Sequence, residues 1–444
     1  MTTAAWTTGR TFRRGEPGYE QARRSTMWNQ RVPDRFPDVI VQANTDDDVV
    51  AAMQMAARDG LTVGVRSGGH SWSGNHVRDG GLLLDVSRLD DVTIDRASMR
   101  AVVGPGIQAS EVIKALMKQG LFFPVGHCLG VCVGGYLLQG GFGWNGRVLG
   151  PACESVVGID YVDAEGVLRH ASETLNADML WAARGSGPGF FGVVLRFHLR
   201  LYHRPGFIGI ATAVYPIDQL EDVFTWAHRI GPEVPTSVEL NVMSARKVSL
   251  MRGQGIEVLA PVFADSWSAA RRATSFMKSR PRGAKAWTPL LPTPMTGLYR
   301  GVMTHYPSAT QWAVDNMWTH APIEDLLPGL RRIADTTPSA PSHLLWMNWS
   351  PPARRPDMAF SVEDNTYLAL YGAWTDSRDE ASASSWAQDR LSEMAHLASG
   401  CQLADENLGR RPARFVTDDH LARLDRLRAN EDPHYRFHPW MGRP

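Results

Sequence analysis

Two glycine-rich segments of the chain carry side chains that can act as nucleophiles. His70 lies in Arg-Ser-Gly-Gly-His-Ser at residues 66–71, and Cys128 lies further along in Gly-His-Cys-Leu-Gly-Val at residues 126–131. Imidazole and thiol groups can form covalent bonds. Glycine lets backbone N–H groups approach a ligand closely. The two segments together predict a large phosphate-bearing cofactor that is held mainly by main chain, with two side chains able to bond to it.

Composition excludes several other classes of protein. The 444 residues are 43% hydrophobic and 21% charged, which is ordinary for a folded globular chain and suggests two domains. Forty-six basic residues balance forty-six acidic ones, so the net charge gives no field that would attract nucleic acid or a membrane surface. The sequence lacks a run of about 18 apolar residues and lacks a signal-peptide pattern. We therefore expect a cytoplasmic protein, and the sequence says nothing about its oligomeric state.

The four cysteines do not follow the spacing of a known metal module. They are Cys128, Cys132, Cys153 and Cys401, and the first three lie close together among glycines. A metal site made of His127, Cys128 and Cys132 is an alternative, but a glycine-rich setting suits a large ligand better than a compact tetrahedral site. We expect no metal and no structural disulfide.

The elements around these loops alternate between helix and strand. Thr45 and the three aspartates after it predict a helix that ends at Gly60, and Ser110 is expected to cap a second helix that ends at Gly120. Strands are expected at 62–66 and 82–86, a hairpin at 155–170 and a strand at 191–201. Pro205 and Gly206 then suggest a boundary, which gives a cofactor domain at residues 1–205.

The remainder mixes helices and strands in a way typical of an α+β layer. Helices are expected at 217–230, 268–277 and 381–397, and strands at 256–260 and 367–374. We assign residues 206–404 to a substrate domain. Residues 405–444 form a C-terminal segment that includes a helix at 418–428.

Familiar nucleotide-binding and hydrolase motifs do not fit. The Gly-Ser-Gly-Pro-Gly segment at 185–189 precedes an alternating strand rather than the helix that a dinucleotide fingerprint needs. The P-loop and G-x-S-x-G spacings are absent. Taken alone, His70 reads as a turn histidine and Cys128 as a buried thiol, but their joint occurrence in this order favours cofactor attachment.

The pair of loops resembles the berberine bridge enzyme-like oxidases, a group within the vanillyl alcohol oxidase superfamily of FAD-linked proteins. The segments 66–71 and 123–131 carry the resemblance, and the glycines at 134–135 and 140–143, residues 191–194 and the closing Asp-Pro-His-Tyr-Arg-Phe at 432–437 extend it. The resemblance implies an α+β fold, with a two-subdomain PCMH-type FAD-binding domain and an α+β substrate domain whose antiparallel sheet is covered by helices.

The resemblance also implies how FAD is bound. His70 would bond to the 8α carbon of the isoalloxazine and Cys128 to its C6, with Cys132 as a rival attachment point because it stands where the family usually has glycine. Val131 matches a small gatekeeper associated with oxygen access, which favours an oxidase. The cofactor-binding residues expected are Arg66, Ser67, Gly68, Gly69, His70, Ser71, Gly104, Gly106, Gly126, Cys128, Val131, Gly134, Gly135, Gly140, Gly141, Gly143, Gly192, Val193, Val194, Tyr435 and Phe437.

The catalytic base is expected on the strand that ends at Trp374. Tyr367 stands where relatives carry an acid, and Tyr371 shares its face in strand alternation. A tyrosine base would need a pKa well below its usual value of about 10. Gln402 would take the place of a family tyrosine near the tail. Weaker candidates for the base are His343, Glu363 and Asp364.

The resemblance implies an enzyme that removes a hydride from a C–H bond next to O or N of a bulky alcohol, sugar or secondary metabolite. Electrons would pass to O2 and give H2O2, so that the partners are the small-molecule substrate and O2. The alternatives are an oxidative cyclase or amine oxidase, and a flavin-bearing binding or resistance protein. A strong base near the flavin would count against the last of these.

Overall fold

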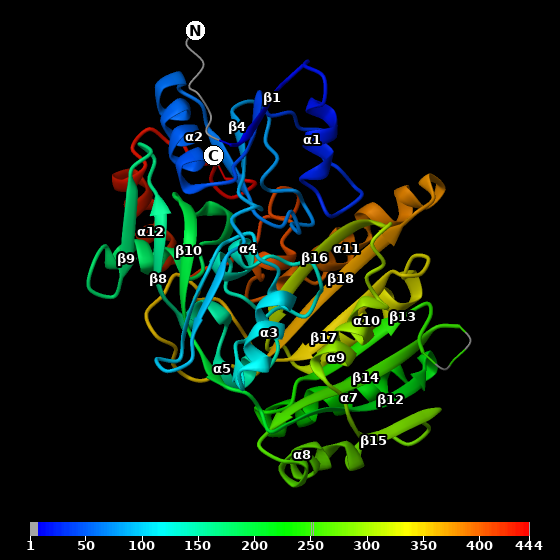
Figure 1. The fold of residues 1–444 in the computed structure, drawn as a ribbon. Coiled ribbons are helices and arrows are strands. Elements are labelled where there is room, and N and C mark those ends of the chain that lie inside the picture. The colour runs from blue at the N-terminus through cyan, green and yellow to red at the C-terminus, as the bar shows by residue number, and fades with distance from the viewer. Residues whose placement is uncertain (1–7, 250, 252, 444) are drawn as a thin grey trace.

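The structure is a computed structural model that describes residues 8–249, 251 and 253–443. Within these residues the strands form sheets of four, five and seven strands and one two-stranded ribbon (Figure 1). No described helix is long and apolar enough to cross a lipid bilayer. The α-helices are α1 (Tyr19–Ser25), α2 (Asp46–Asp59), α3 (Ala109–Lys118), α4 (Val133–Leu138), α5 (Gly146–Leu149), α6 (Ala177–Ala183), α7 (Leu220–Ile230), α8 (Trp267–Ala273), α9 (Met295–Met303), α10 (Ile323–Thr336), α11 (Glu380–Glu393) and α12 (Asp418–Glu431).

Two sheets and the ribbon occupy the N-terminal part of the chain. The four-stranded sheet has the order β1 (Arg10–Arg13), β2 (Val39–Gln42), β4 (Leu82–Asp85), β3 (Val63–Arg66), with the last three strands parallel. The five-stranded sheet is antiparallel, in the order β5 (Val92–Asp95), β6 (Arg100–Val103), β10 (Val193–Arg200), β8 (Val156–Val162), β9 (Leu168–Ser172). β7 (Leu121–Phe122) pairs with β11 (Tyr202–His203). The hairpin expected at 155–170 is β8 and β9.

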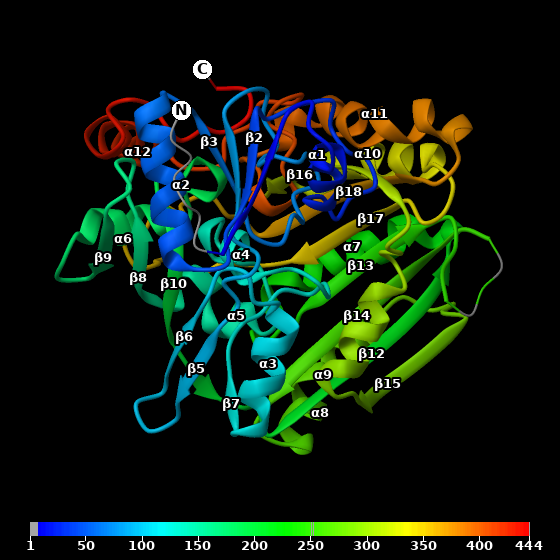
Figure 2. The same ribbon diagram turned by 45° about the horizontal axis from the view of Figure 1, so that its top comes forward.

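The seven-stranded antiparallel sheet contains the middle of the chain. Its order is β15 (Ala286–Pro292), β12 (Phe207–Pro216), β14 (Gly255–Ala264), β13 (Leu240–Ala245), β17 (His343–Asn348), β18 (Thr366–Trp374), β16 (Gln311–Thr319). Apolar residues of one sheet face pack against α7, α10 and α11 in a single core cluster. The other face points toward the N-terminal sheets (Figure 2). The α+β fold predicted from the sequence is therefore confirmed.

Strand alternation decides which side chains of β18 reach that second face. Leu368 and Leu370 pack in the helix-covered core, whereas Tyr367 and Tyr371 belong to an aromatic cluster on the opposite side. The expectation that the two tyrosines share a face is confirmed.

Helix starts follow local signals in one case and tertiary pairing in another. α2 begins after Thr45, whose side chain forms a capping box with Asp48, and it ends at Gly60 in a left-handed conformation. The prediction that Ser110 caps α3 is wrong: Gln108 precedes the helix and makes no side-chain cap bond. Gln108 bridges to Cys132, and the N–H of Ala109 donates to the carbonyl of Val131. This pairing starts the helix earlier than the local signal suggested.

The C-terminal segment returns to the four-stranded sheet. Phe437 forms a parallel bridge with Val63, and the N–H of Val63 donates to the carbonyl of Arg436 at 2.6 Å. Trp440 packs against Gly189, where a Cβ would lie only 2.2 Å from the indole ring.

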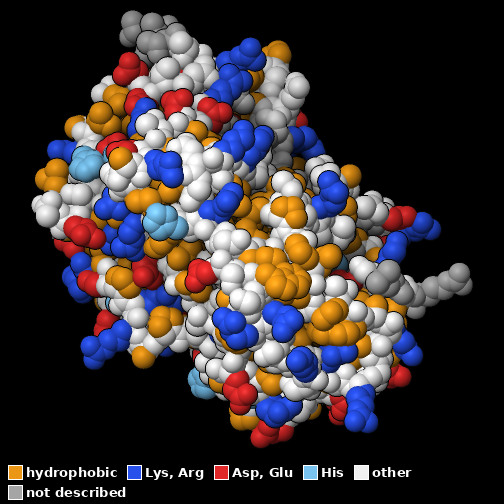
Figure 3. Space-filling view, turned by 60° about the horizontal axis from the view of Figure 1, so that its bottom comes forward, with side chains coloured by type: hydrophobic (Ala, Val, Ile, Leu, Met, Phe, Trp, Pro, Cys, Tyr) orange, Lys and Arg blue, Asp and Glu red, His pale blue; other side chains and the backbone are white. Residues whose placement is uncertain are grey.

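On the face shown in Figure 3, basic and acidic side chains are interspersed, as the balanced composition predicts.

Candidate active site

A cavity of about 660 Å³ lies between the glycine-rich loops and the second face of the seven-stranded sheet. The tyrosines of β18 line it together with the loops that carry His70 and Cys128, so one space joins the two predicted halves of the site. Tyr367, Tyr371 and Gln402 all line this cavity. The predicted cofactor-binding residues on its wall are Arg66, Ser67, Gly68, Gly69, His70, Ser71, Gly126, Cys128, Val131, Gly134, Gly135, Gly192, Val194 and Phe437.

The structure places the other predicted cofactor residues off the cavity wall. Gly104 and Gly106 donate their N–H groups to the carbonyls of Asp91 and Leu89, so those amides already have protein acceptors. A Cβ on either glycine would meet the backbone of residues 87–89 at under 2.4 Å, which explains the need for glycine by packing. Packing also explains Gly140, Gly141 and Gly143, which adjoin Phe360, Ala152 and Tyr136. Val193 is buried in the core and Tyr435 is exposed.

His70 is held against an aromatic ring at the cavity wall. Its imidazole stacks on Trp28 with ring centroids 4.8 Å apart and an interplanar angle of 23°. Burial, together with the nearby Arg66 guanidinium, lowers the pKa of His70 to about 4. The imidazole is therefore neutral at neutral pH and retains the lone pair that a nucleophile needs.

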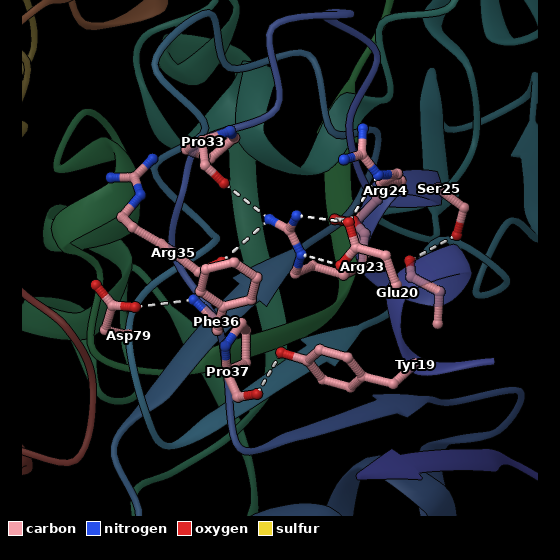
Figure 4. A network of polar contacts seen from close by, with 12 residues as sticks. Tyr19, Glu20, Arg23, Arg24, Ser25, Pro33, Arg35, Phe36, Pro37 and Asp79 are labelled. Carbon is pink, nitrogen blue, oxygen red and sulfur yellow. Dashed lines mark hydrogen bonds and ion pairs between the residues drawn. The ribbon is translucent and has the colours of Figure 1, made fainter. Parts of the chain in front are cut away.

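A network around Arg23 anchors the segment that supplies Trp28. The Arg23 guanidinium donates to the Glu20 carboxylate and to the carbonyls of Pro33 and Arg35, and it lies 4.5 Å from the Phe36 ring centroid (Figure 4). These bonds tie the end of α1 to residues 33–36, and the intervening turn carries Trp28. The N–H of Trp28 in turn donates to the carbonyl of Gly69 at 3.0 Å, which fixes it beside the His70 loop.

The two cysteines near the cavity differ in their surroundings. Cys128 packs against the aromatic cluster of the seven-stranded sheet, and burial, with a contribution from Asp405, raises its thiol pKa to about 12. Cys132 packs against Gly68, where a Cβ would lie 3.0 Å from its Sγ, and burial raises its pKa to about 11. Both thiols are therefore protonated in the protein alone.

A half-buried aspartate that the sequence did not reveal also lines the cavity. Asp405 ends a 3₁₀ helix (η8, Leu403–Asp405) and lines the cavity. Its Oδ1 accepts from the indole N–H of Trp72 at 2.6 Å. Its Oδ2 accepts from the hydroxyl of Tyr371 at 2.9 Å and also from that of Tyr367. Three donors thus converge on one carboxyl group.

The proton affinities of this group follow from burial. Burial raises the pKa of Asp405, and the bonds from the two tyrosines and Trp72 act in the opposite direction. Burial and the Asp405 carboxylate raise the pKa values of Tyr367 and Tyr371 well above 10. The phenols are therefore neutral hydrogen-bond donors, and Asp405 is the group in this cluster whose proton is lost most easily.

Comparisons with known proteins show which family the chain belongs to. Residues 37–172 match the model of an FAD binding domain. An FAD-linked oxidoreductase (ptmO) of Penicillium ochrochloron is 30% identical over 433 residues, covering 96% of this chain and 95% of that protein. The chain belongs to the FAD-linked oxidoreductases.

Solved structures of the same fold cover nearly the whole oxidoreductase. The 6-hydroxy-D-nicotine oxidase of Arthrobacter nicotinovorans matches with a TM-score of 0.85 and 20% identity, over 99% of this chain and 98% of that one. A BBE-like protein of Physcomitrella patens matches with a TM-score of 0.83 and 18% identity, over 98% and 96% of the two chains. At these identities the likeness concerns the fold.

The loop before His70 fits the phosphate-bearing part of FAD. Within the described chain, the backbone N–H groups of residues 67–71 donate to no protein acceptor, although all five residues line the cavity. A run of free amides forms an anion-binding concavity. Arg66 adds a guanidinium that is paired with Asp85 at 2.9 Å, and Ser67 Oγ accepts from the N–H of Gly135 at 3.2 Å. These bonds hold the loop to β4 and α4.

Gln402 shapes the turn that presents Asp405. Its Oε1 accepts from the N–H of Ala404 at 2.5 Å, which caps η8. Its Nε2 is buried without a partner among the described residues, and Gln402 lines the cavity. An N–H donor that lacks a protein acceptor here is available to a bound molecule.

The weaker candidates for the base lie elsewhere. Glu363 accepts from Arg355 and from the indole of Trp349, and Asp364 lies 2.6 Å from His320. His343 is fully buried behind Tyr371, with ring centroids 4.7 Å apart. None of these three candidates lines the cavity in the described structure.

The metal site considered from the sequence does not assemble. Nε2 of His127 lies 3.0 Å from Glu239 Oε2, and its ring contacts Trp144. Among the described residues, Asp160, His170 and His198 bring three ligand atoms within 4.8 Å of one another. They lie on β8, β9 and β10 and do not line the cavity.

Proposed function

We propose that this FAD-linked oxidoreductase is an oxidase whose flavin is bonded to both His70 and Cys128. It removes a hydride from a C–H bond next to O or N of a bulky small molecule and passes the electrons to O2, which gives H2O2. The observation that supports this most is the single cavity that joins His70 and Cys128 to the Asp405 carboxylate.

Each chemical role falls to a different part of the cavity. When bound, the flavin supplies the hydride acceptor and the two-electron link to O2. The substrate hydroxyl or amine donates its proton toward Asp405, through the hydroxyl of Tyr367 or Tyr371, as the C–H bond breaks. The product is a carbonyl or imine. The peroxide receives both substrate hydrogens, one that leaves as hydride and one as the proton held by Asp405.

The Asp405 carboxylate also helps to distinguish between the alternative functions. A flavin-bearing binding or resistance protein has no need of a buried base, so the three donors that converge on Asp405 favour an enzyme over that alternative. An oxidative cyclase or amine oxidase would use the same base and the same cavity, and differs from an alcohol oxidase only in its substrate. Val131 on the cavity wall supports O2 as the acceptor through the resemblance of its position to the small gatekeeper.

Acid denaturation of the purified protein tests the attachment. We expect yellow flavin to stay with the wild-type polypeptide and with His70→Ala and Cys128→Ala, because each single variant keeps one bond. The double variant should release its flavin. Free loss of flavin from the wild type would contradict the covalent proposal. A screen for peroxide release against alcohols, oligosaccharides and aromatic metabolites tests the oxidase activity.

A further inference from the structure

The cavity extends along the sheet to another carboxylate, which lies on a different strand from the tyrosines that bind Asp405. Glu257 lies on β14 and is 3% exposed, and it lines the cavity. Its Oε1 accepts from the N–H of Ser249 at 2.5 Å, and its Oε2 lies 3.4 Å from Nε2 of His305. Within the described chain no arginine or lysine forms an ion pair with it. Burial lowers the pKa of His305 against the opposing effect of Glu257, so His305 is a poor permanent cation.

An acceptor without a partner in the described chain lies on the strand next to that of Glu257. Asn241 on the neighbouring strand β13 lines the cavity, and its Oδ1 is buried without a partner among the described residues. The arginines on the cavity wall are Arg66 and Arg78, which belong to the His70 side of the molecule, and the lining described has no lysine, so His305 is the basic side chain beside Glu257. The Glu257 end of the cavity is therefore rich in acceptors and short of positive charge.

The sheet order sets the distance between β18, whose tyrosines bind Asp405, and β14, which carries Glu257. Tyr367 on β18 pairs with Met347 on β17, Met347 pairs with Asn241 on β13, and β13 neighbours the strand of Glu257. Three strand spacings of about 4.8 Å separate β18 from β14, which is roughly 14 Å. The side chains between the two ends are apolar: Met243, Leu345 and Met347 line the cavity there.

Helix α9 supplies another part of the wall along this path. Its residues Gly297, Leu298, Gly301 and Val302 line the cavity, and the helix lies over β12 and β14 (Figure 2). These side chains add no charge to the apolar stretch between the two ends.

We infer that the Glu257 end of the cavity binds a protonated amine, and that the substrate is an elongated, mainly apolar amine whose reacting C–H lies at the Asp405 end. A buried carboxylate without a cation is costly, and a cationic ligand that also donates to Asn241 Oδ1 removes that cost. Apolar side chains between the two polar ends hold the body of the molecule. The inference rests on the proposed function only for where the reacting carbon lies.

Binding of amines to the flavin-loaded protein, measured in the absence of O2, tests the inference separately from peroxide formation. The probes are α,ω-amino alcohols of increasing chain length, with the matching n-alkanols and ω-hydroxy acids as references, followed by thermal shift and by changes in flavin absorbance. We expect wild type to prefer the matched-length amino alcohol over the alkanol by about ten- to hundredfold in Kd, as a charge-assisted hydrogen bond provides. Glu257→Gln should abolish that preference and leave alkanol binding within about threefold.

The choice of variants separates recognition from folding. Gln keeps an oxygen acceptor for the N–H of Ser249, so Glu257→Gln removes the charge without removing that bond. Asn241→Leu is a second variant, which should weaken amine binding and retain alkanol binding. Thr212→Val on the same sheet face is the control and should keep the amine preference. A wild type that binds alkanols as tightly as amines, or a Glu257→Gln variant that keeps the preference, would overturn the inference. Loss of peroxide formation with amine binding intact would instead count against the proposed function.

Discussion

The hydroxyl of Tyr371 donates a 2.9 Å hydrogen bond to Oδ2 of Asp405, across 34 positions of the chain. Tyr367, on the same face of β18, donates to the same oxygen. The bonds tie the substrate-side sheet to the turn that begins the C-terminal segment. Because both phenols are neutral donors, they stabilise the ionised carboxylate, which is the group that the proposed function makes the proton acceptor.

Replacement of Asp405 tests whether it accepts the substrate proton. We expect Asp405→Asn to lower kcat by about 10²- to 10⁴-fold, the usual contribution of a general base. Burial raises the pKa of Asp405, and the base works only when deprotonated, so the wild-type rate should rise with pH through that pKa. In a plot of rate against pH, this rise forms an acidic limb, and the asparagine variant should lack it. Asp364→Asn is a matched control outside the cavity and should keep both the wild-type rate and the acidic limb of its pH dependence. If the acidic limb persists in Asp405→Asn, Asp405 is not the base.

We expect the two tyrosines to have different roles: Tyr367 relays the substrate proton, and Tyr371 holds the Asp405 carboxylate in place. Tyr371 is packed against His343 and Trp72, with ring centroids 4.7 and 5.7 Å away, so we expect it to support the carboxylate. Tyr371→Phe removes a donor worth roughly 1.5–3 kcal/mol, which raises the pKa of Asp405 further and moves the acidic limb to higher pH. Tyr367→Phe should also lower the rate on the plateau, by about ten- to hundredfold. Full pH–rate profiles measure both effects, and an unchanged plateau in Tyr367→Phe would remove it as the relay.

Many helices and strands could be predicted from the sequence because the residues that begin and end them are close together in the chain. The Thr45 cap, the acidic first turn and Gly60 lie within one helix, and α2 begins and ends where they predict. Ser110 failed as a cap because a distant segment decides where α3 begins: the carbonyl of Val131 takes the N–H of Ala109. No local pattern contains that contact.

The sequence predicted the candidate residues on the cofactor side of the cavity but not the carboxylate on the opposite side. His70 and Cys128 stand out because a reactive side chain within glycines is unusual in itself. Asp405 becomes reactive only through burial and through donors from Trp72, Tyr367 and Tyr371, which the fold brings from two other segments. The predicted site residue nearest to Asp405 in the sequence was Gln402, three residues earlier. Glycine is ambiguous in another way, since close packing at Gly104 and ligand approach at Gly68 use the same residue type.

Gly130 should control the position of His70. It has a φ of +84°, and a Cβ there would lie 3.0 Å from Nε2 of His70. Gly130→Ala should destabilise the protein by about 1–2 kcal/mol through the left-handed backbone and should also reduce flavin attachment at His70. Gly120→Ala is the matched control, with a φ of +74° and nothing within 4 Å of the added carbon. In the Cys128→Ala background, the fraction of flavin that stays with the denatured polypeptide measures the difference, and equal retention in the two variants would contradict the prediction.

Buried histidines should make the protein less stable in mild acid. Burial lowers the pKa of His343 to about 3, from 6.5 in an exposed histidine. Between these values the unfolded chain binds a proton that the folded protein excludes, so the contribution of His343 to stability is complete above pH 6.5 and is lost as the pH falls toward 3. The loss is about 1.4 kcal/mol per pH unit at most. Urea unfolding at pH 7 and pH 5, followed by tryptophan fluorescence, should therefore show a smaller pH dependence in His343→Gln than in wild type. The exposed His434→Gln should keep the wild-type dependence; an equal dependence in all three proteins would show that His343 accepts a proton in the folded state.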